Sequence, residues 1–357
     1  FFSNTSILEY CLAYYATVEP ELYKQMTQKG NRGSFVHELS FYSGIIKDCT
    51  DLLDSLNLEI TETILDNMDV LDEIEGIKIK IELQSDKESF KKAITQNRKT
   101  MTEIDDMTEV AVTRNEKTPM EITKLNTIDE SESFMELLAI YGNVIKNAET
   151  ASKKQKKLHL DTYILGMNFQ FGLMIKDFSA YLNSKTKEDL PDEIREKHPA
   201  LTDEEYNEIR ESILDLLKIA LPIGMQFFIA ENVGTPKLDI VINELIKENE
   251  DKKFTKFMLS FLYCDISNGR IKNFLQEYIK NEESKDILKL VLFKLGFYYS
   301  MRYFGNNAQV DNAILDLITD VQIKLSGKNQ LGAKMRKGEI KKQIRQQFET
   351  QRRQIAL

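Results

Sequence analysis

The sequence predicts a mainly α-helical protein, built as an irregular array of helical hairpins similar to tetratricopeptide and HEAT arrays. Its 357 residues contain only six prolines and fifteen glycines, too few for many short strands and turns. Apolar residues recur every three or four positions over long stretches, which is the period of a helix with one buried face. The 42% of hydrophobic residues is sufficient to form a core.

The region before residue 76 is expected to be helical and acidic. Apolar positions from Val36 to Leu56 predict one long helix, and Ile60 to Leu71 continue the pattern on a second helix. The opposite face of that second helix has no basic residue, and its carboxylates lack the spacing of a calcium loop. We interpret it as a solvated acidic face; its members are Glu59, Glu62, Asp66, Asp69, Asp72, Glu73 and Glu75.

After Gly76 the period changes. Ile77, Ile79, Ile81 and Leu83 alternate with polar residues, which predicts a strand, and Val110 with Val112 repeats the pattern weakly. The sequence therefore predicts a polar insertion with two or three short strands.

From Ser131 onwards the helical period returns. Phe134 to Ala148 forms one apolar stripe, Lys153–Lys157 is interpreted as a basic connector, and Thr202 with Glu205 makes a capping box before the next helix. Five shorter helices are then expected at 238–247, 254–264, 271–280, 287–301 and 313–325. Short paired helices bury their apolar faces by stacking on one another.

Four segments follow from these patterns: 1–57, a motif helix and connector; 58–130, the polar insertion; 131–326, the helical-hairpin array; and 327–357, a basic C-terminal helix or tail.

Charge is distributed unevenly along the chain. The net charge is −9, yet 324–353 carries ten basic residues against Glu339 and Glu349, which is a net of +8. Three interpretations of the tail stay open: a helix docking on a neighbour through Ile340, Ile344, Phe348 and Ile355, a phosphate-binding surface for nucleic acid, or a disordered end. The candidate phosphate- or partner-binding residues are Lys334, Arg336, Lys337, Lys341, Lys342, Arg345, Arg352 and Arg353.

Residues for catalysis are scarce. The three cysteines and three histidines have no metal-ligand or nucleophile–base spacing. Residues Gly327–Lys334 depart from a phosphate-binding P-loop, because Ala333 occupies the position of its lysine. We therefore expect no catalytic residue, cofactor or metal site, and no enzyme activity, in this chain. No stretch has the roughly 20 clean apolar residues of a membrane span.

Two segments carry a family resemblance. Residues Phe2–Tyr15 resemble the end of the winged-helix part of NACHT-type ATPases of the STAND superfamily, which often reads F-x-H-x-S-F-x-E-Y/F-F-A-A, and Phe41–Asp48 takes the place of the pattern that follows it. The first segment is expected to pack through Ile7, Leu8, Cys11, Leu12 and Tyr15. Asn4 replaces the histidine that senses nucleotide phosphates in this family.

The resemblance implies that an ATPase core precedes Phe1 and that the array is the sensor of an NLR-like signalling or antiviral-defence protein. Such a sensor binds a protein ligand and relays binding to the ATPase and its effector, with oligomerisation through the core and a hinge near Phe35–Asp48. Cytoplasmic location and no membrane partner are expected. The alternatives are a stand-alone protein-binding scaffold and a nucleic-acid-binding module that uses the tail.

Overall fold

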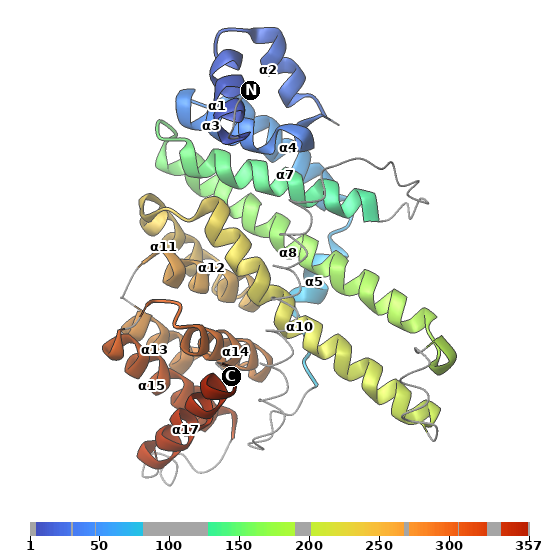
Figure 1. Ribbon diagram of the computed structural model, residues 1–357, viewed down its shortest axis with the longest axis vertical. Helices are drawn as coiled ribbons and strands as arrows, with labels where there is room; N and C mark the ends of the chain where they lie inside the picture. Colours follow the sequence, from blue (N-terminus) through green and yellow to red (C-terminus); the bar gives the residue numbers. More distant parts are fainter. Residues whose placement is uncertain are drawn as a thin grey trace. The chain divides into compact units, whose positions relative to one another are not determined.

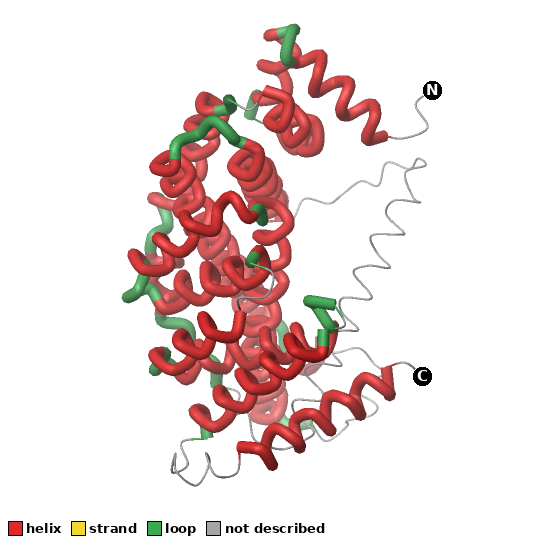
Figure 2. The backbone as a smooth tube through the Cα atoms, turned by 90° about the vertical axis from the view of Figure 1, so that its left-hand side faces the viewer, coloured by secondary structure: helices red, strands yellow, loops and turns green. Residues whose placement is uncertain are grey.

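A computed structural model describes residues 5–29, 31–46, 48–80, 128–189, 201–267, 271–305, 307–326 and 337–355. Within these ranges the chain forms α-helices and three short 3₁₀ helices, and no strand (Figure 2). The predicted mainly helical class, an array of paired helices, is confirmed.

The helices before residue 190 are α1 (Thr5–Ala16), α2 (Pro20–Thr27), η1 (Arg32–Phe35), α3 (Val36–Ile46), α4 (Thr50–Leu65), α5 (Asp69–Glu75), α7 (Ile128–Asn147), α8 (Lys153–Ser184) and η2 (Lys187–Asp189). Those after residue 200 are α10 (Asp203–Val233), η3 (Pro236–Leu238), α11 (Asp239–Glu248), α12 (Lys253–Ile266), α13 (Ile271–Asn281), α14 (Lys285–Met301), α15 (Ala308–Leu325) and α17 (Lys337–Ile355).

The chain divides into two compact units, each assembled from three separate stretches. Unit 1 consists of Phe1–Ile77, Leu125–Ala180 and Gly224–Asn268, and unit 2 of Lys78–Lys124, Tyr181–Ile223 and Gly269–Leu357. These units do not test the four segments predicted from the sequence, 1–57, 58–130, 131–326 and 327–357, which stay a prediction.

Unit 1 is built around the apolar middle of α8. Tyr163, Phe169 and Phe171 on this helix are almost fully buried, and Phe171 stacks on Phe254 of α12 with ring centroids 5.1 Å apart. Figure 1 shows α11 and α12 as a neighbouring pair that completes this unit. The close approach of α5 to α8 requires Gly172, because a Cβ there would lie 2.2 Å from Val70 Cγ1.

The start of α12 is capped from a distant part of unit 1. The Glu75 carboxylate accepts hydrogen bonds from the backbone N–H of Phe254 at 2.9 Å and of Thr255 at 3.1 Å. A negative charge at a helix N-terminus satisfies free N–H groups and interacts favourably with the helix dipole. Glu75 therefore joins α5 to α12.

Unit 2 contains the C-terminal hairpins. α14 packs on α15, and α15 also packs on α13 and α17 (Figure 1). Leu292, Leu317 and Tyr298 are among the side chains that form its core.

The predicted strand is wrong where the structure describes it. Ile77–Lys80 is neither helix nor strand, and residues 81–127, including Ile81, Leu83, Val110 and Val112, lie outside the described residues. The backbone of this segment hydrogen-bonds to side chains rather than to a neighbouring strand. Ile79 N–H donates to Asp286 Oδ1 at 3.1 Å, and the Lys218 ammonium donates to the Lys78 carbonyl at 3.0 Å. Of the alternating apolar residues that the structure describes, Ile79 is buried and Ile77 is half-buried.

Two helix predictions need correction. The helix expected over 36–56 is broken between Ile46 and Thr50, where the Asp48 carboxylate accepts a hydrogen bond from the Thr50 hydroxyl at 2.9 Å. Lys153–Lys157 is not a connector but the start of α8, which begins at a capping box between Ser152 and Gln155.

Other local signals are confirmed. The Thr202 hydroxyl accepts from Glu205 N–H at 3.2 Å, and the Glu205 carboxylate accepts from Thr202 N–H at 2.9 Å. Helix α5 ends at Gly76, as predicted. The five C-terminal helices occur where they were expected, with α15 starting five residues earlier.

One described helix, α10, has the length and apolar composition that a membrane crossing requires. A central helix of a folded core meets the same criterion, so this feature by itself is weak evidence for a membrane span.

Candidate functional site

The basic tail forms helix α17, which lies antiparallel to α15 in unit 2. Lys337 pairs with Asp320, Lys341 lies 2.6 Å from Asp316, and Arg345 donates to Asn312. The basic residues of α17 and their partners on α15 each recur every four residues, so the contacts form a row along the facing sides of the two helices.

Apolar contacts complete this docking. Ile344 and Phe348 are buried, and the Phe348 ring meets Tyr299 of α14 edge-on with centroids 5.0 Å apart. Burial raises the pKa of Asp316, but Lys341 and Lys272 outweigh it and hold the pKa below its usual value. The tail is thus a docked amphipathic helix over its described residues.

The eight candidate residues of the tail have different outcomes. Lys337, Lys341 and Arg345 contact α15, whereas Lys342 is exposed. Lys334 and Arg336 lie outside the described residues, as does the P-loop-like Gly327–Lys334. The backbone of Arg352 and Arg353 belongs to α17, and their side chains are not described. Phosphate binding by the tail stays a prediction.

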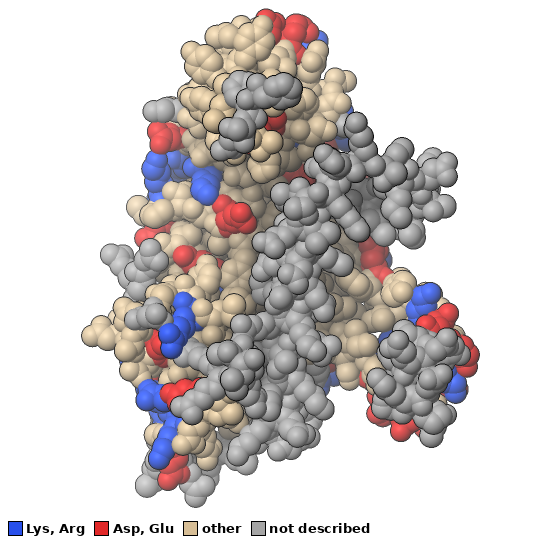
Figure 3. All heavy atoms as spheres, viewed as in Figure 1, with Lys and Arg blue, Asp and Glu red and all other residues tan. Residues whose placement is uncertain are grey.

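The N-terminal helix packs differently from the prediction. α1 rests on its neighbours through Ala13 and Ala16, whereas Ile7, Leu8, Cys11 and Tyr15 of the expected packing face are exposed and Leu12 is half-buried. Its open surface, here called the α1 face, has few charges (Figure 3). The α1 face comprises Ile7, Leu8, Tyr10, Tyr14 and Tyr15 of α1 and Val18 of the turn that follows it, and Phe41 of α3 meets Tyr10 edge-on.

Asn4, the position compared with the family's histidine, lies outside the described residues. The second resembling segment is on α3, where Tyr42 stacks on Tyr23 with ring centroids 4.7 Å apart. The Asn147 amide of α7 donates to the Ser43 hydroxyl at 3.0 Å and to the Ser40 carbonyl at 3.1 Å. The end of α3 is therefore tied to α7 by hydrogen bonds.

A buried histidine in unit 1 meets a carboxylate 105 positions away in sequence. The Tyr141 hydroxyl donates to Asn57 Oδ1 at 3.0 Å and lies 2.9 Å from His159 Nδ1. Because that hydroxyl has one proton, His159 Nδ1–H is the donor to Tyr141, and Nε2 is left facing Asp54 Oδ1 at 3.5 Å. Burial lowers the pKa of His159, and Asp54 opposes this shift.

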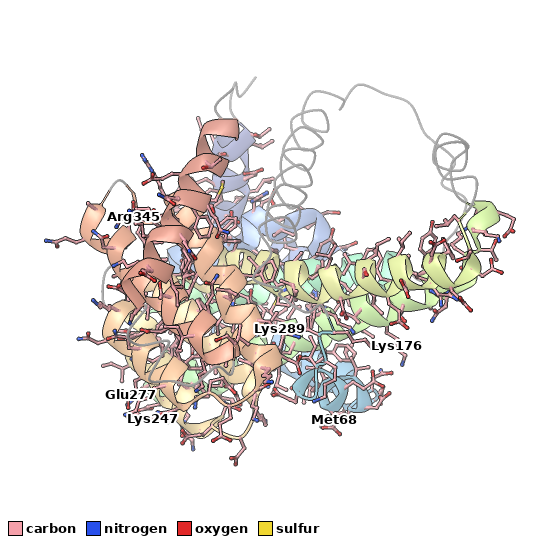
Figure 4. The ribbon with its side chains drawn as sticks, turned by 90° about the horizontal axis from the view of Figure 1, so that it is seen from below. Met68, Lys176, Lys247, Glu277, Lys289 and Arg345 are labelled. Carbon is pink, nitrogen blue, oxygen red and sulfur yellow. The ribbon has the colours of Figure 1, made fainter. Side chains whose placement is uncertain are left out.

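Five of the seven residues of the predicted acidic face are exposed, and exposed apolar side chains lie among them. Leu58, Leu65 and Met68 are 59%, 61% and 50% exposed, while the opposite side of α4 is buried. Figure 4 shows Met68 at the edge of unit 1. We call this surface the α4–α5 face; it comprises Leu58, Leu65 and Met68 with the exposed carboxylates Asp51, Asp54, Glu62, Asp66, Asp69, Asp72 and Glu73.

Glu59 and Glu75 of the predicted acidic face have partners within the protein and are not part of the exposed surface. Glu59 pairs with the buried Arg32 and with Lys29, and Glu75 caps α12. The sequence had no signal for these pairings, because each joins residues from separate elements.

The described residues hold no group of three His, Cys, Asp or Glu side chains arranged to bind a metal ion. Comparison with protein-family models, curated proteins and solved structures finds no match for this chain.

Proposed function

We propose that this chain is a protein-binding helical scaffold and, more specifically, the sensor region of a NACHT-like signalling or antiviral-defence ATPase. In this role it binds a protein ligand in the cytoplasm and relays binding to an ATPase core and effector. The finer assignment rests on the resemblance of Phe2–Tyr15 and Phe41–Asp48 to that family.

The observation that supports a protein-binding role is the α1 face. Large apolar side chains scattered singly on a surface are ordinary, but a contiguous group on one helix is typical of an interface. Tyrosine is enriched at such interfaces because it offers a large apolar area with a polar end. Tyr10, Tyr14 and Tyr15 together on α1 fit this pattern.

The NACHT-like role assigns the α1 face to contact with the ATPase core. In the natural gene product, we expect p-benzoylphenylalanine at Tyr14 to give a crosslink that maps to an ATPase region. The matched control is the same substitution at Ile240, which is also exposed but lies on α11. Equal crosslinking from both positions would remove the support for this contact.

The stand-alone scaffold is the alternative, and the reading frame separates the two. A Walker motif upstream supports the ATPase assignment, and its absence from the complete gene leaves the scaffold. In either case we expect this chain alone neither to bind nor to hydrolyse ATP, and turnover by the purified chain would refute that.

A further inference from the structure

From the α4–α5 face we infer a docking site for a basic amphipathic helix of a partner protein. Leu58 and Leu65 are seven residues apart, so both lie along the centre of the exposed side of α4, about 10 Å from each other. The inference deepens the proposed protein-binding role by naming the chemistry of the partner, and it does not depend on the ATPase assignment.

The apolar residues are flanked by one sign of charge. Asp54 and Glu62 lie four residues before and after Leu58, and Asp66 continues the same row. Such a row on a surface helix normally carries charges of both signs, which limits self-repulsion. Between residues 48 and 77 this chain has no lysine or arginine, and Lys176 of α8 lies 3.9 Å from Asp69.

Charge excludes several other occupants. A second copy of the α4–α5 face would place two sets of carboxylates against each other, which is repulsive. Nucleic acid and anionic membranes are repelled for the same reason. A metal ion is not favoured, since the described carboxylates form no coordinating group.

The same chain shows how a basic helix is held on such a surface. In unit 2, α17 places Lys337 and Lys341 against Asp320 and Asp316 of α15, while Phe348 is buried beside this row. The α4–α5 face has the same elements, carboxylates four residues apart and adjacent apolar side chains, but its Leu58 and Leu65 are exposed. The partner it fits is a helix with lysine or arginine every four residues and leucine-like residues between them.

The test uses the whole chain and a fluorescent amphipathic peptide of leucine and lysine, about 18 residues long, enough for five turns. We expect saturable binding by fluorescence anisotropy and slower amide exchange in 50–75 on binding. Replacing both leucines, Leu58→Ser with Leu65→Ser, is expected to weaken binding about tenfold or more, because two buried anchors are lost. The charge variant, Glu62→Gln with Asp66→Asn, is expected to weaken it several-fold and to reduce its salt dependence.

Controls separate this site from general attraction to an acidic protein. Ile240→Ser removes an equally exposed apolar residue from α11, and Glu204→Gln with Glu208→Gln removes two exposed charges from α10; both should leave the affinity unchanged. Since all substituted residues are exposed, the melting temperature should stay the same. Equal peptide affinity of the leucine double variant and of Ile240→Ser would overturn the inference. So would amide exchange in 50–75 that does not change when the peptide binds. Neither result would change the outcome of the crosslinking test of the α1 face.

Discussion

Glu75 and Thr255 are 180 positions apart, yet one carboxylate oxygen of Glu75 accepts both the N–H of Thr255, at 3.1 Å, and its hydroxyl, at 2.5 Å. The Thr255 hydroxyl in turn accepts from the Asn168 amide at 2.8 Å. This chain of hydrogen bonds connects α5, α12 and α8 inside unit 1.

Glu75→Ala is expected to lower the free energy of unfolding by about 1–3 kcal/mol, because two N–H groups and a hydroxyl at the start of α12 lose their acceptor. Urea denaturation followed by circular dichroism measures the change. Glu73→Ala, two residues away and exposed, serves as the control. Equal effects of the two substitutions would contradict the capping role.

Gly172→Ala is expected to destabilise unit 1 by about 1–3 kcal/mol through overpacking, since the new methyl group would approach Ile74 Cδ1 to 2.4 Å and Val70 Cγ1 to 2.2 Å. Gly44 in α3 is the matched control, because nothing lies within 4 Å of a Cβ there. Gly44→Ala should stabilise by up to about 1 kcal/mol through helix propensity. A neutral Gly172→Ala would mean that α5 and α8 are farther apart.

Lys341→Glu is expected to detach α17, because it places a like charge beside Asp316. Hydrogen exchange over 337–350 should become faster, while exchange in α13 stays unchanged. The exposed Lys342 provides the control, and Lys342→Glu should leave α17 protected.

The Asp316 pKa gives this docking a pH dependence. Since the folded state holds that pKa below its ordinary value, the stabilisation is present at neutral pH and is lost as the pH falls through the lowered value. The protection factors of the α17 amides, which correct for the intrinsic pH dependence of exchange, should therefore fall in strong acid, and Asp316→Asn should lower them already at pH 7.

His159 predicts a second pH effect, in unit 1. Burial lowers its pKa in the folded state, so the unfolded chain binds a proton first as the pH falls through about 6.5. The free energy of unfolding should thus decrease between pH 7 and 5. The substitution His159→Gln should make the free energy of unfolding less dependent on pH. The control substitution His37→Gln, at an exposed position, should leave the pH dependence as it is. Parallel pH profiles for the two variants would refute the assignment.

Local signals in the sequence were sufficient for most helices. The Thr202 and Glu205 capping box involves residues three apart, so neighbouring residues determine it. Gly76 marks the end of α5, as the sequence predicted, although its φ of −91° is one that other residues also adopt. The array class follows from the same local information.

Long-range pairing could not be predicted from the sequence. α1 is apolar nearly all round, so its period does not indicate that Ala13 and Ala16 are the buried side. His159 and Asp54 come from different helices, and only the packing of α8 against α4 brings them together. The sequence identified the acidic face of 59–75, but not the exposure of Leu58 and Leu65 in its midst.

The four-residue repeat on α15 and α17 permits more than one alignment of the two helices. If α17 slid by one turn, Lys341 would face Asp320 and Arg345 would face Asp316, so two of the three polar contacts could form again. Phe348 would then leave its place against Tyr299. The charged rows are consequently compatible with more than one register, and the buried Ile344 and Phe348 select the one observed.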